Sequence, residues 1–319
     1  MPYDTIRATH DTPAQAALNA GARDRVHHLV EVARGCCREA AALLRRRAAE
    51  GTTARDKTAH ERVSDADLES ERLLRDTLGA AVPGSAVIGE ELPPAGPAAG
   101  SSRAPGTAVS PGEDVTWYVD PIDGTHNFLR GLPLACVSVG VAVGGRLVGG
   151  CVHDVFRDES FTGGEGVPLR VDGAAPPPAP AGGGLPLVFT DIPLTGRSGT
   201  AEPAFYLELI ERADVRRLYS TALSLAWLAA GRADLACNVP IRPWDVAAGA
   251  ALVRAAGGRY TPVGAPEPAA APGFVATGPR PDGDGDRGLA ELERWAVARL
   301  TALHRGPTDT GAGSVDVVR

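Results

Sequence analysis

The chain has 319 residues and 44% apolar side chains, enough to fill the core of one large domain or two ordinary ones. Its formal net charge is −7 and its isoelectric point is near 5.6, which argues against a nucleic-acid-binding surface, because such a surface needs a basic face. No stretch approaches the apolar length that spans a bilayer, and the first residues lack the basic and apolar regions of a secretion signal. We therefore expect a cytoplasmic protein that acts on a small molecule, with no membrane and no nucleic acid as partner.

Helices are predicted at the start of the chain. Apolar residues recur with helical spacing over residues 14–49, which predicts one or two long amphipathic helices. A further helix is expected over residues 65–78, ended by Gly79.

The first carboxylates of interest follow a predicted strand. Residues 85–88 are apolar, and Glu90 and Glu91 come just after them. Residues 93–112 are then rich in Pro, Ala, Gly and Ser, a composition that buries too little apolar surface to hold one shape. This segment is expected to be a mobile loop, either a lid over a site or a tolerated surface insertion.

The most informative stretch is residues 117–128, Trp-Tyr-Val-Asp-Pro-Ile-Asp-Gly-Thr-His-Asn-Phe. Its bulky start predicts a buried strand that ends at Asp120, and the proline fixes the turn that follows. Asp123 then begins a helix or turn whose first free amides, those of Gly124 and Thr125, can meet an anion. The alternative is that Asp-Gly only marks a turn and Asp120 only caps a helix.

Strands are predicted next, and then alternating strands and helices. Residues 135–143 and 146–153 predict a hairpin around Gly144-Gly145 in an antiparallel sheet, and residues 156–162 predict another strand. After a linker-like stretch at 174–184, strands are expected over 187–190 and 274–277, and helices over 202–212, from about 221, over 246–256 and over 288–303.

This pattern predicts an α/β (α+β) chain in two halves. The N-terminal half covers residues 14–175 and carries most of the acidic residues that we expect to bind metal. The C-terminal half covers residues 185–303, and residues 304–319 are expected to be a disordered tail. The C-terminal half contributes a third acidic junction, because Asp245 stands at the head of an Ala-rich helix. Carboxylates from separate junctions of this kind are how oxygen-ligand sites for magnesium are built.

The five cysteines are odd in number and lack the spacing of zinc ligands, so reduced core thiols are expected. The histidines show no metal-binding spacing either. His126 stands beside Thr125 and is expected at the rim of the site rather than as a ligand.

Taken in order, these motifs resemble the inositol monophosphatase family of magnesium-dependent, lithium-sensitive phosphatases. The resemblance covers roughly residues 25–278 and rests on Val63-Ser-Asp-Ala-Asp67, Glu90-Glu91, Asp120-Pro-Ile-Asp-Gly-Thr125, the helical segment 220–231, and Trp244-Asp245 followed by Ala255-Ala-Gly-Gly258. It implies a layered αβαβα sandwich, with an antiparallel sheet in the N-terminal half and a smaller α/β layer in the C-terminal half. It also implies a homodimer, two or three Mg²⁺ ions, and a site in the cleft between the halves.

The resemblance also assigns roles to individual residues. Glu90, Asp120 and the main-chain carbonyl of Ile122 would hold a first Mg²⁺. Asp120 would bridge to a second ion bound by Asp123 and Asp245, and Asp67 would help place a third through water.

The remaining roles concern water and phosphate. Thr125 would hydrogen-bond the attacking water and pass its proton toward Asp67, with Glu90 completing the catalytic group. The amides of Gly124 and Thr125 would bind phosphate, and Glu91 would contact either a metal or only the residues around it.

The substrate side departs from the family pattern. Tyr219-Ser220 stands where the family has Gly-Ser or Gly-Thr, and Asn238 stands where it often has a glutamate. Tyr219 could stack on a flat ring, since an aromatic face replaces empty space, or it could pack into the helix. Arg242 could meet a second anionic group or form a surface salt bridge.

The sequence thus predicts a magnesium-dependent phosphomonoesterase that hydrolyses a small phosphorylated alcohol, which is an inositol-phosphate-like compound, a sugar phosphate or a nucleoside phosphate. A bisphosphate nucleotidase, a fructose bisphosphatase and a histidinol phosphatase share the same metal chemistry and remain alternatives. A non-catalytic phospholigand-binding protein is an alternative from another class. It would lack a ligand carboxylate or Thr125, and none of these is missing.

Overall fold

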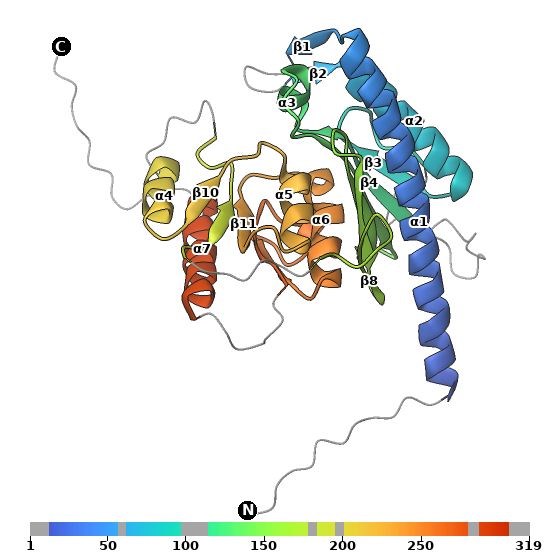
Figure 1. Ribbon diagram of the computed structural model, residues 1–319. Coiled ribbons are helices and arrows are strands. Elements are labelled where there is room, and N and C mark those ends of the chain that lie inside the picture. Colours follow the sequence, from blue (N-terminus) through green and yellow to red (C-terminus); the bar gives the residue numbers. More distant parts are fainter. Residues whose placement is uncertain are drawn as a thin grey trace, which may run out of the picture.

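The computed structural model describes residues 13–56, 62–96, 114–177, 184–194, 201–279 and 287–305. These residues form five layers, in which helices and sheets alternate (Figure 1). A six-stranded and a five-stranded sheet enclose one pair of helices, and further helices cover the outer face of each sheet. The predicted αβαβα sandwich is confirmed.

One outer layer consists of α1 (Pro13–Glu50) and α2 (Asp65–Ala81), which pack on each other and on the six-stranded sheet. The first predicted helical region is one helix, and its apolar residues recur on one buried face, among them Leu29, Ala33 and Leu44.

The expected end of α2 at Gly79 is wrong, because the helix continues to Ala81. Gly79 is exposed and nothing lies near it, so the glycine costs about 1 kcal/mol of helix stability without breaking the helix. The start of α2 is fixed by Ser64 and Asp67, whose side chains each bond the other residue's main-chain amide in a capping box.

The six-stranded sheet carries the central motif. Its strands lie in chain order and are β3 (Ala86–Gly89), β4 (Val115–Asp123), β5 (Cys136–Val143), β6 (Arg146–Asp154), β7 (Glu159–Gly164) and β8 (Val167–Val171). β3 and β4 are parallel, and the other neighbours are antiparallel. The β4–β5 register shifts between Asp120 and Asp123, where the proline interrupts the ladder.

The hairpin predicted around Gly144-Gly145 is confirmed, and both glycines have positive φ, at 58° and 81°. The strand expected to start at residue 156 begins instead at Glu159, because residues 155–158 form the turn after β6. β8 was not predicted. Its short, half-exposed sequence at the sheet edge carries little hydrophobic pattern.

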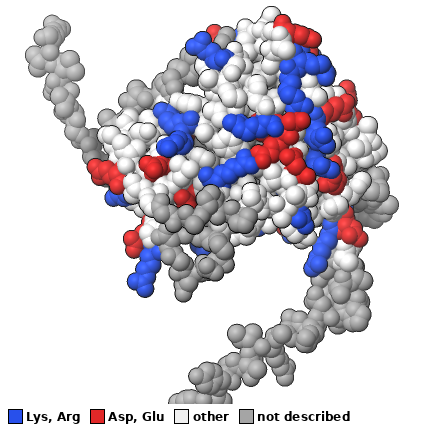
Figure 2. All heavy atoms as spheres, in the orientation of Figure 1, with Lys and Arg blue, Asp and Glu red and all other residues white. Residues whose placement is uncertain are grey.

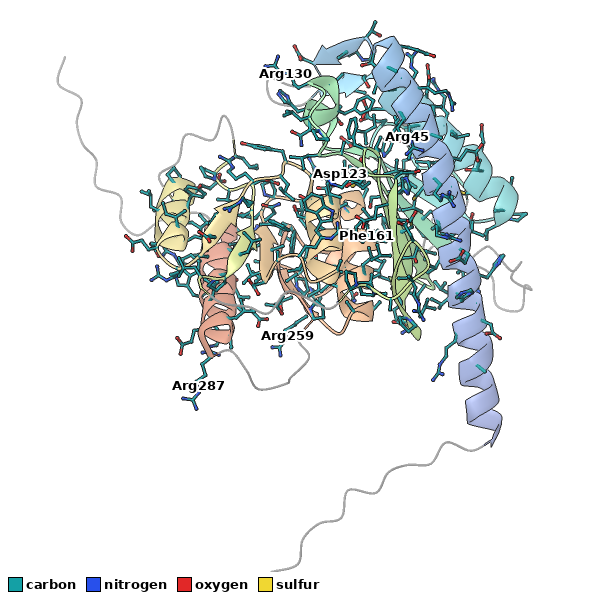
Figure 3. All side chains as sticks on the ribbon, in the orientation of Figure 1. Arg45, Asp123, Arg130, Phe161, Arg259 and Arg287 are labelled. Atoms are coloured by element: carbon teal, nitrogen blue, oxygen red, sulfur yellow. The ribbon has the colours of Figure 1, made fainter. Side chains whose placement is uncertain are left out.

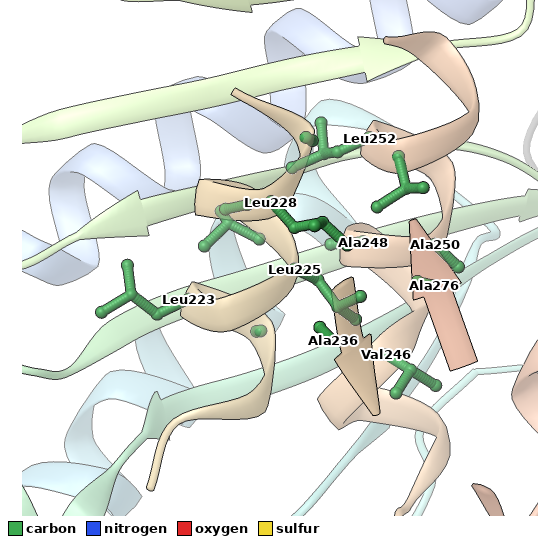
Figure 4. Close-up of a cluster of buried hydrophobic side chains, with 14 of the residues drawn as sticks. Leu223, Leu225, Leu228, Ala236, Val246, Ala248, Ala250, Leu252 and Ala276 are labelled. Atoms are coloured by element: carbon green, nitrogen blue, oxygen red, sulfur yellow. The ribbon is translucent and has the colours of Figure 1, made fainter. Parts of the chain in front are cut away.

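The middle layer is formed by α5 (Thr221–Ala229) and α6 (Pro243–Ala255), which are apolar on nearly every side. Figure 4 shows their leucine, valine and alanine side chains meeting those of the second sheet. α6 also approaches the first sheet closely, since a Cβ on Gly140 would lie 2.5 Å from the Ala247 Cβ. The same core cluster includes residues of both sheets, so the two sheets are packed together through α5 and α6.

The five-stranded sheet has the order β10-β9-β11-β13-β12, with β9 (Leu187–Phe189), β10 (Asp214–Arg216), β11 (Leu235–Asn238), β12 (Arg259–Val263) and β13 (Gly273–Thr277). Its outer face is covered by α4 (Ala201–Ile210) and α7 (Arg287–Arg305). Four short elements complete the described chain, namely α3 (Thr125–Leu129), the 3₁₀ turn Pro268–Ala270, and the antiparallel pair β1 (Ala54–Asp56) and β2 (Arg62–Ser64).

All five cysteines are buried and free, as expected of core thiols. No helix in the described part of the chain is both long and apolar enough to cross a membrane. Figure 2 shows acidic and basic side chains interspersed on the visible face. Most of the predicted lid or insertion (97–112), part of the linker (178–183) and residues 306–319 of the predicted tail lie outside the described residues. Residues 304 and 305, which were expected in the tail, belong to α7 instead. The division into two halves remains a prediction.

Candidate active site

The parallel pairing of β3 and β4 brings the first two acidic segments together. Gly89, the last residue of β3, is paired with Val119 of β4, so Glu90 and Asp120, which follow these two residues, lie at the same end of the parallel pair. Asp120 is 2% exposed, and its Oδ1 accepts the amide of Ile122 at 3.1 Å. The two carboxylates predicted to share a metal therefore start from neighbouring strands.

The pKa values indicate that the charges of five carboxylates act on one another at this end of β3 and β4. Burial raises the pKa of Asp120 well above its ordinary value, and the charges of Glu90, Asp123, Asp245 and Asp67 raise it further, in that order. These four acids come from the 90–91 segment, the end of β4, the start of α6 and the start of α2. All four acids are thus close enough to Asp120 for their charges to act on it.

Asp67 and Thr125 form the hydrogen-bonded part of this cluster. The Thr125 hydroxyl lies 3.1 Å from Asp67 Oδ1 and 2.9 Å from the Ile122 carbonyl oxygen, so its single proton has two acceptors. Asp67 is fully buried and its Oδ2 accepts both the amide and the hydroxyl of Ser64. Burial raises the pKa of Asp67 to about 6, although these hydrogen bonds oppose the shift.

Asp123 connects the end of β4 to the N-terminus of α5. Its Oδ2 accepts the Ser220 hydroxyl at 2.9 Å and the amides of Ala222 and Leu223, and its Oδ1 accepts the amide of Thr221 at 3.2 Å. Figure 3 shows Asp123 between the first sheet and the middle helices. Burial raises the pKa of Asp123 to about 6, and the hydrogen bonds from α5 limit the rise.

Asp245 lies in the first turn of α6, which begins at Pro243, three residues before the predicted start. One carboxylate oxygen, Oδ2, accepts the amide of Arg242 at 2.7 Å. Burial, followed by the charge of Asp123, raises the pKa of Asp245 to about 8.

Gly124 turns the chain from β4 into α3. Its φ of 93° is left-handed, and a Cβ there would lie 2.6 Å from the Leu134 carbonyl oxygen, so glycine fits this position without strain. The Phe128 amide closes the first helical bond onto the Gly124 carbonyl. The amides of Gly124 and Thr125 precede that bond, as expected for residues at a helix start.

The residues of this cluster fit a hard divalent cation. Every donor is an oxygen, and the carboxylates raise one another's pKa, a repulsion that a bound cation would relieve. In the described ranges, however, no three His, Cys, Asp or Glu side chains are already placed to hold one ion. Protein donors occupy several of these oxygens instead, so the individual metal roles remain predictions.

On the substrate side, Tyr219 stands out from the protein surface. It is 44% exposed and has a left-handed φ of 51°, and its amide donates to Asp191 Oδ1 at 2.8 Å. The Arg217 guanidinium covers one face of the ring, 4.8 Å from its centre. Tyr219 therefore does not pack into α5.

Asn238 is buried beside Asp191, the residue that binds the Tyr219 amide. Its Oδ1 accepts the amide of Asp191 at 2.7 Å, and its Nδ2 donates to Asp191 Oδ2 at 3.2 Å and to the Thr221 hydroxyl at 3.1 Å. Asn238 thus holds the residues around Tyr219 in place.

The other predicted site residues differ in their exposure. Ser220 is buried and bonds Asp123, whereas Arg242 and His126 are exposed. The amide of Glu91 donates to Glu71 Oε2 at 2.7 Å.

Three residues of this region were missed from the sequence. Asp191 directly follows the strand predicted over residues 187–190, and Glu71 lies one helical turn after Asp67, so both signals were present. Cys136, whose sulfur lies 3.6 Å from Asp123 Oδ2, carried no such signal.

A separate cavity of 370 Å³ lies at the other end of α6, with Arg254, Ala255 and Glu165 in its wall. Asp245 is in the first turn of that helix, so this cavity is not the acidic site.

The comparisons with known proteins point to one family. The model of the inositol monophosphatase family matches residues 25–290. Inositol-1-monophosphatase SuhB of Mycobacterium tuberculosis is 34% identical over 285 residues, which cover 84% of this chain and 94% of that protein. Nus factor SuhB of Salmonella typhimurium is 34% identical over 215 residues, 64% of this chain and 73% of that protein.

A solved structure gives the same result for the fold. The inositol monophosphatase from Anabaena superposes with a TM-score of 0.67 at 25% identity, over 85% of this chain and 95% of that one. The chain belongs to the inositol monophosphatase family, and it is a phosphomonoesterase.

Proposed function

We propose that this protein is a Mg²⁺-dependent phosphomonoesterase that hydrolyses a small phosphorylated alcohol with water as the nucleophile. The observation that carries the proposal is the convergence of five carboxylates beside a threonine hydroxyl that already bonds one of them. Glu90, Asp120 and the Ile122 carbonyl would hold one ion, and Asp120, Asp123 and Asp245 another. Asp67 would help place a third ion through water.

Bound Mg²⁺ ions would neutralise the phosphate and stabilise both the attacking and the leaving oxygen of an in-line displacement. The amides of Gly124 and Thr125 would orient the phosphate at the start of α3. The attacking water would lose a proton through the Thr125 hydroxyl toward Asp67 Oδ1, 3.1 Å away. The water oxygen then bonds phosphorus, the bond to the alcohol oxygen breaks, and that oxygen takes up a proton.

Tyr219 supports a substrate with a flat ring. Its neighbour Ser220 bonds Asp123, so the main chain of Tyr219 is one residue away from a side chain that contacts the acidic cluster. Arg217 covers one face of the ring, and an aromatic base would stack on the other. Among the predicted substrates, nucleoside phosphates gain most from this contact.

The oligomeric state, location, partners and metal content of the protein remain predictions. These are a homodimer, a cytoplasmic location, the absence of a nucleic-acid partner, and the number of Mg²⁺ ions. The interspersed charges of the visible face are compatible with a small-molecule partner (Figure 2).

The test is phosphate release from a panel of inositol, sugar and nucleoside monophosphates, with and without Mg²⁺. Asp120→Asn removes the charge at the centre of the cluster with little change of volume, so we expect activity to fall by roughly 100-fold or more. Asp76→Asn is the matched control, because Asp76 is exposed on α2 and lies outside the site. The proposal fails if no substrate is hydrolysed faster with Mg²⁺, or if Asp120→Asn matches its parent.

A further inference from the structure

A buried ion pair on α2 holds the segment that carries Glu90. Glu71 is fully buried and lies one helical turn after Asp67. Arg75, a further turn on, donates from Nε at 2.9 Å and from Nη2 at 2.6 Å to Glu71 Oε1. The Arg75 charge compensates the buried Glu71 carboxylate, and these charge-assisted bonds fix both side chains.

The same ion pair binds the main chain just after Glu90. Glu71 Oε2 accepts the Glu91 amide at 2.7 Å, and Oε1 accepts the Leu92 amide at 3.2 Å. Arg75 donates from Nη2 to the Leu92 carbonyl and from Nη1 to the Pro93 carbonyl, both at 2.8 Å. Two side chains of α2 thus bind the amides of residues 91 and 92 and the carbonyls of residues 92 and 93.

Gly89 lets the strand come this close. A Cβ at Gly89 would lie 2.3 Å from Glu71 Oε1 and 2.5 Å from its Cδ, so any larger residue would push the pair away. Gly89 is also the last residue of β3 and is paired with Val119 of β4. Glu90 therefore stands between two anchored points, the end of a strand and a main chain bound by Glu71.

A second contact joins the same helix face to the other acidic segment. The Ser70 hydroxyl, next to Glu71 in sequence, donates to the Pro121 carbonyl at 3.1 Å. Asp67, Ser70 and Glu71 thus place α2 against Thr125, the 120–123 segment and the 90–93 segment in turn. The α2 face acts as a common support for ligands that come from different parts of the chain.

We propose that Glu71, with Arg75, is a positioning residue that fixes the Glu90 carboxylate for cation binding, although Glu71 itself contacts neither cation nor substrate. The proposal rests on the proposed function, in which Glu90 is a ligand. Its consequence is that disturbing Glu71 lowers the affinity for Mg²⁺ while leaving substrate binding and the chemical step at saturating Mg²⁺ largely intact. Residues that orient ligands in this way commonly change metal affinity by about 10–100-fold.

The test uses Glu71→Gln, which keeps the volume but replaces one accepting oxygen by an amide nitrogen. Mg²⁺ binding to the substrate-free protein is measured by titration calorimetry, and phosphate release is measured against Mg²⁺ concentration. We expect the dissociation constant and the half-saturating Mg²⁺ concentration to rise about tenfold, with kcat at saturating Mg²⁺ and the substrate KM changed less than about twofold. Glu69→Gln is the matched control on the same helix, because Glu69 is partly exposed and its carboxylate contacts Arg47 of α1 rather than the segment that follows Glu90.

The outcomes separate this inference from the proposed function. If the parent protein neither binds Mg²⁺ nor releases phosphate, the proposed function fails. If the parent does both and Glu71→Gln binds Mg²⁺ with unchanged affinity, or loses only thermal stability, the positioning role is refuted.

Should Glu71→Gln fail to fold, Arg75→Lys gives the answer. The lysine keeps a charge for Glu71 but cannot also bridge the Leu92 and Pro93 carbonyls. A smaller rise in the Mg²⁺ dissociation constant supports the proposal, and an unchanged constant overturns it.

Discussion

Asp123 serves two parts of the chain with one carboxylate. It ends β4 in the first sheet, and its oxygens accept a hydroxyl and three amides at the N-terminus of α5. A carboxylate is favoured there because the first amides of a helix lack partners within the helix and carry partial positive charge. An amide at this position would weaken both the packing of α5 and the acidic cluster, which is why Asp120 is the cleaner position for testing metal use.

Tyr219 provides a test of substrate choice at the residue scale. Tyr219→Gly removes the ring and suits the left-handed backbone, so we expect no loss of stability. If the ring stacks on a base, the rate on a nucleoside monophosphate relative to glycerol phosphate should fall about tenfold. An unchanged ranking of substrates in the phosphate-release assay would show that Tyr219 does not contact the substrate.

At the scale of elements, α6 links the chemistry to the core. Its first turn holds Asp245, and its middle packs so closely on β5 and β6 that Gly140 and Gly150 leave no room for a Cβ. Interiors of this density transmit small shifts rather than absorbing them. The position of Asp245 therefore depends on glycines in the sheet that touch no ligand.

Two glycine substitutions should change stability in opposite directions. Gly140→Ala would place a Cβ 2.5 Å from the Ala247 Cβ, so we expect the free energy of unfolding, measured with urea, to fall by about 1–3 kcal/mol. Gly79→Ala, in an open position on α2, should raise the free energy of unfolding by about 0.5–1 kcal/mol, because alanine has the higher helix propensity. Equal midpoints for the two variants would contradict the close packing of α6 on β5.

At the scale of the whole molecule, the acidic cluster makes the fold sensitive to pH and to cations. Burial and mutual repulsion raise the pKa of Asp245 from 3.8 to about 8 and those of Asp67 and Asp123 from 3.8 to about 6. At a pH between 3.8 and its raised pKa, each of these carboxyls keeps a proton in the folded protein that it has lost in the unfolded chain. These three carboxyls therefore make the metal-free protein lose stability as the pH rises from near 4 to about 8.

Thermal unfolding with EDTA and with Mg²⁺ tests this dependence. Between pH 6 and pH 8 we expect the metal-free melting temperature to fall and the stabilisation by Mg²⁺ to grow, because cations bind the ionised carboxylates. Asp245→Asn should flatten the metal-free slope. A metal-free melting temperature that rises over this pH range would contradict the raised pKa values.

Much of the architecture could be predicted because its signals are local. The helical spacing of α1, the Gly144-Gly145 hairpin and the strand before Asp120 each follow from a few neighbouring residues. The errors arose where local signals were weak. Gly79 proved compatible with a helix supported by packing, and β8 is a short strand at the sheet edge.

By itself, the sequence determined the elements, the order of the acidic motifs and the family that they indicate. Only the tertiary structure decided which groups meet. It showed that Asp123 is bonded to α5, that Tyr219 is exposed beside Arg217, and that Glu71 holds the segment after Glu90. The physical reason is that propensity and hydrophobic period act over a few residues, whereas these contacts join groups far apart in the chain and depend on how the layers pack.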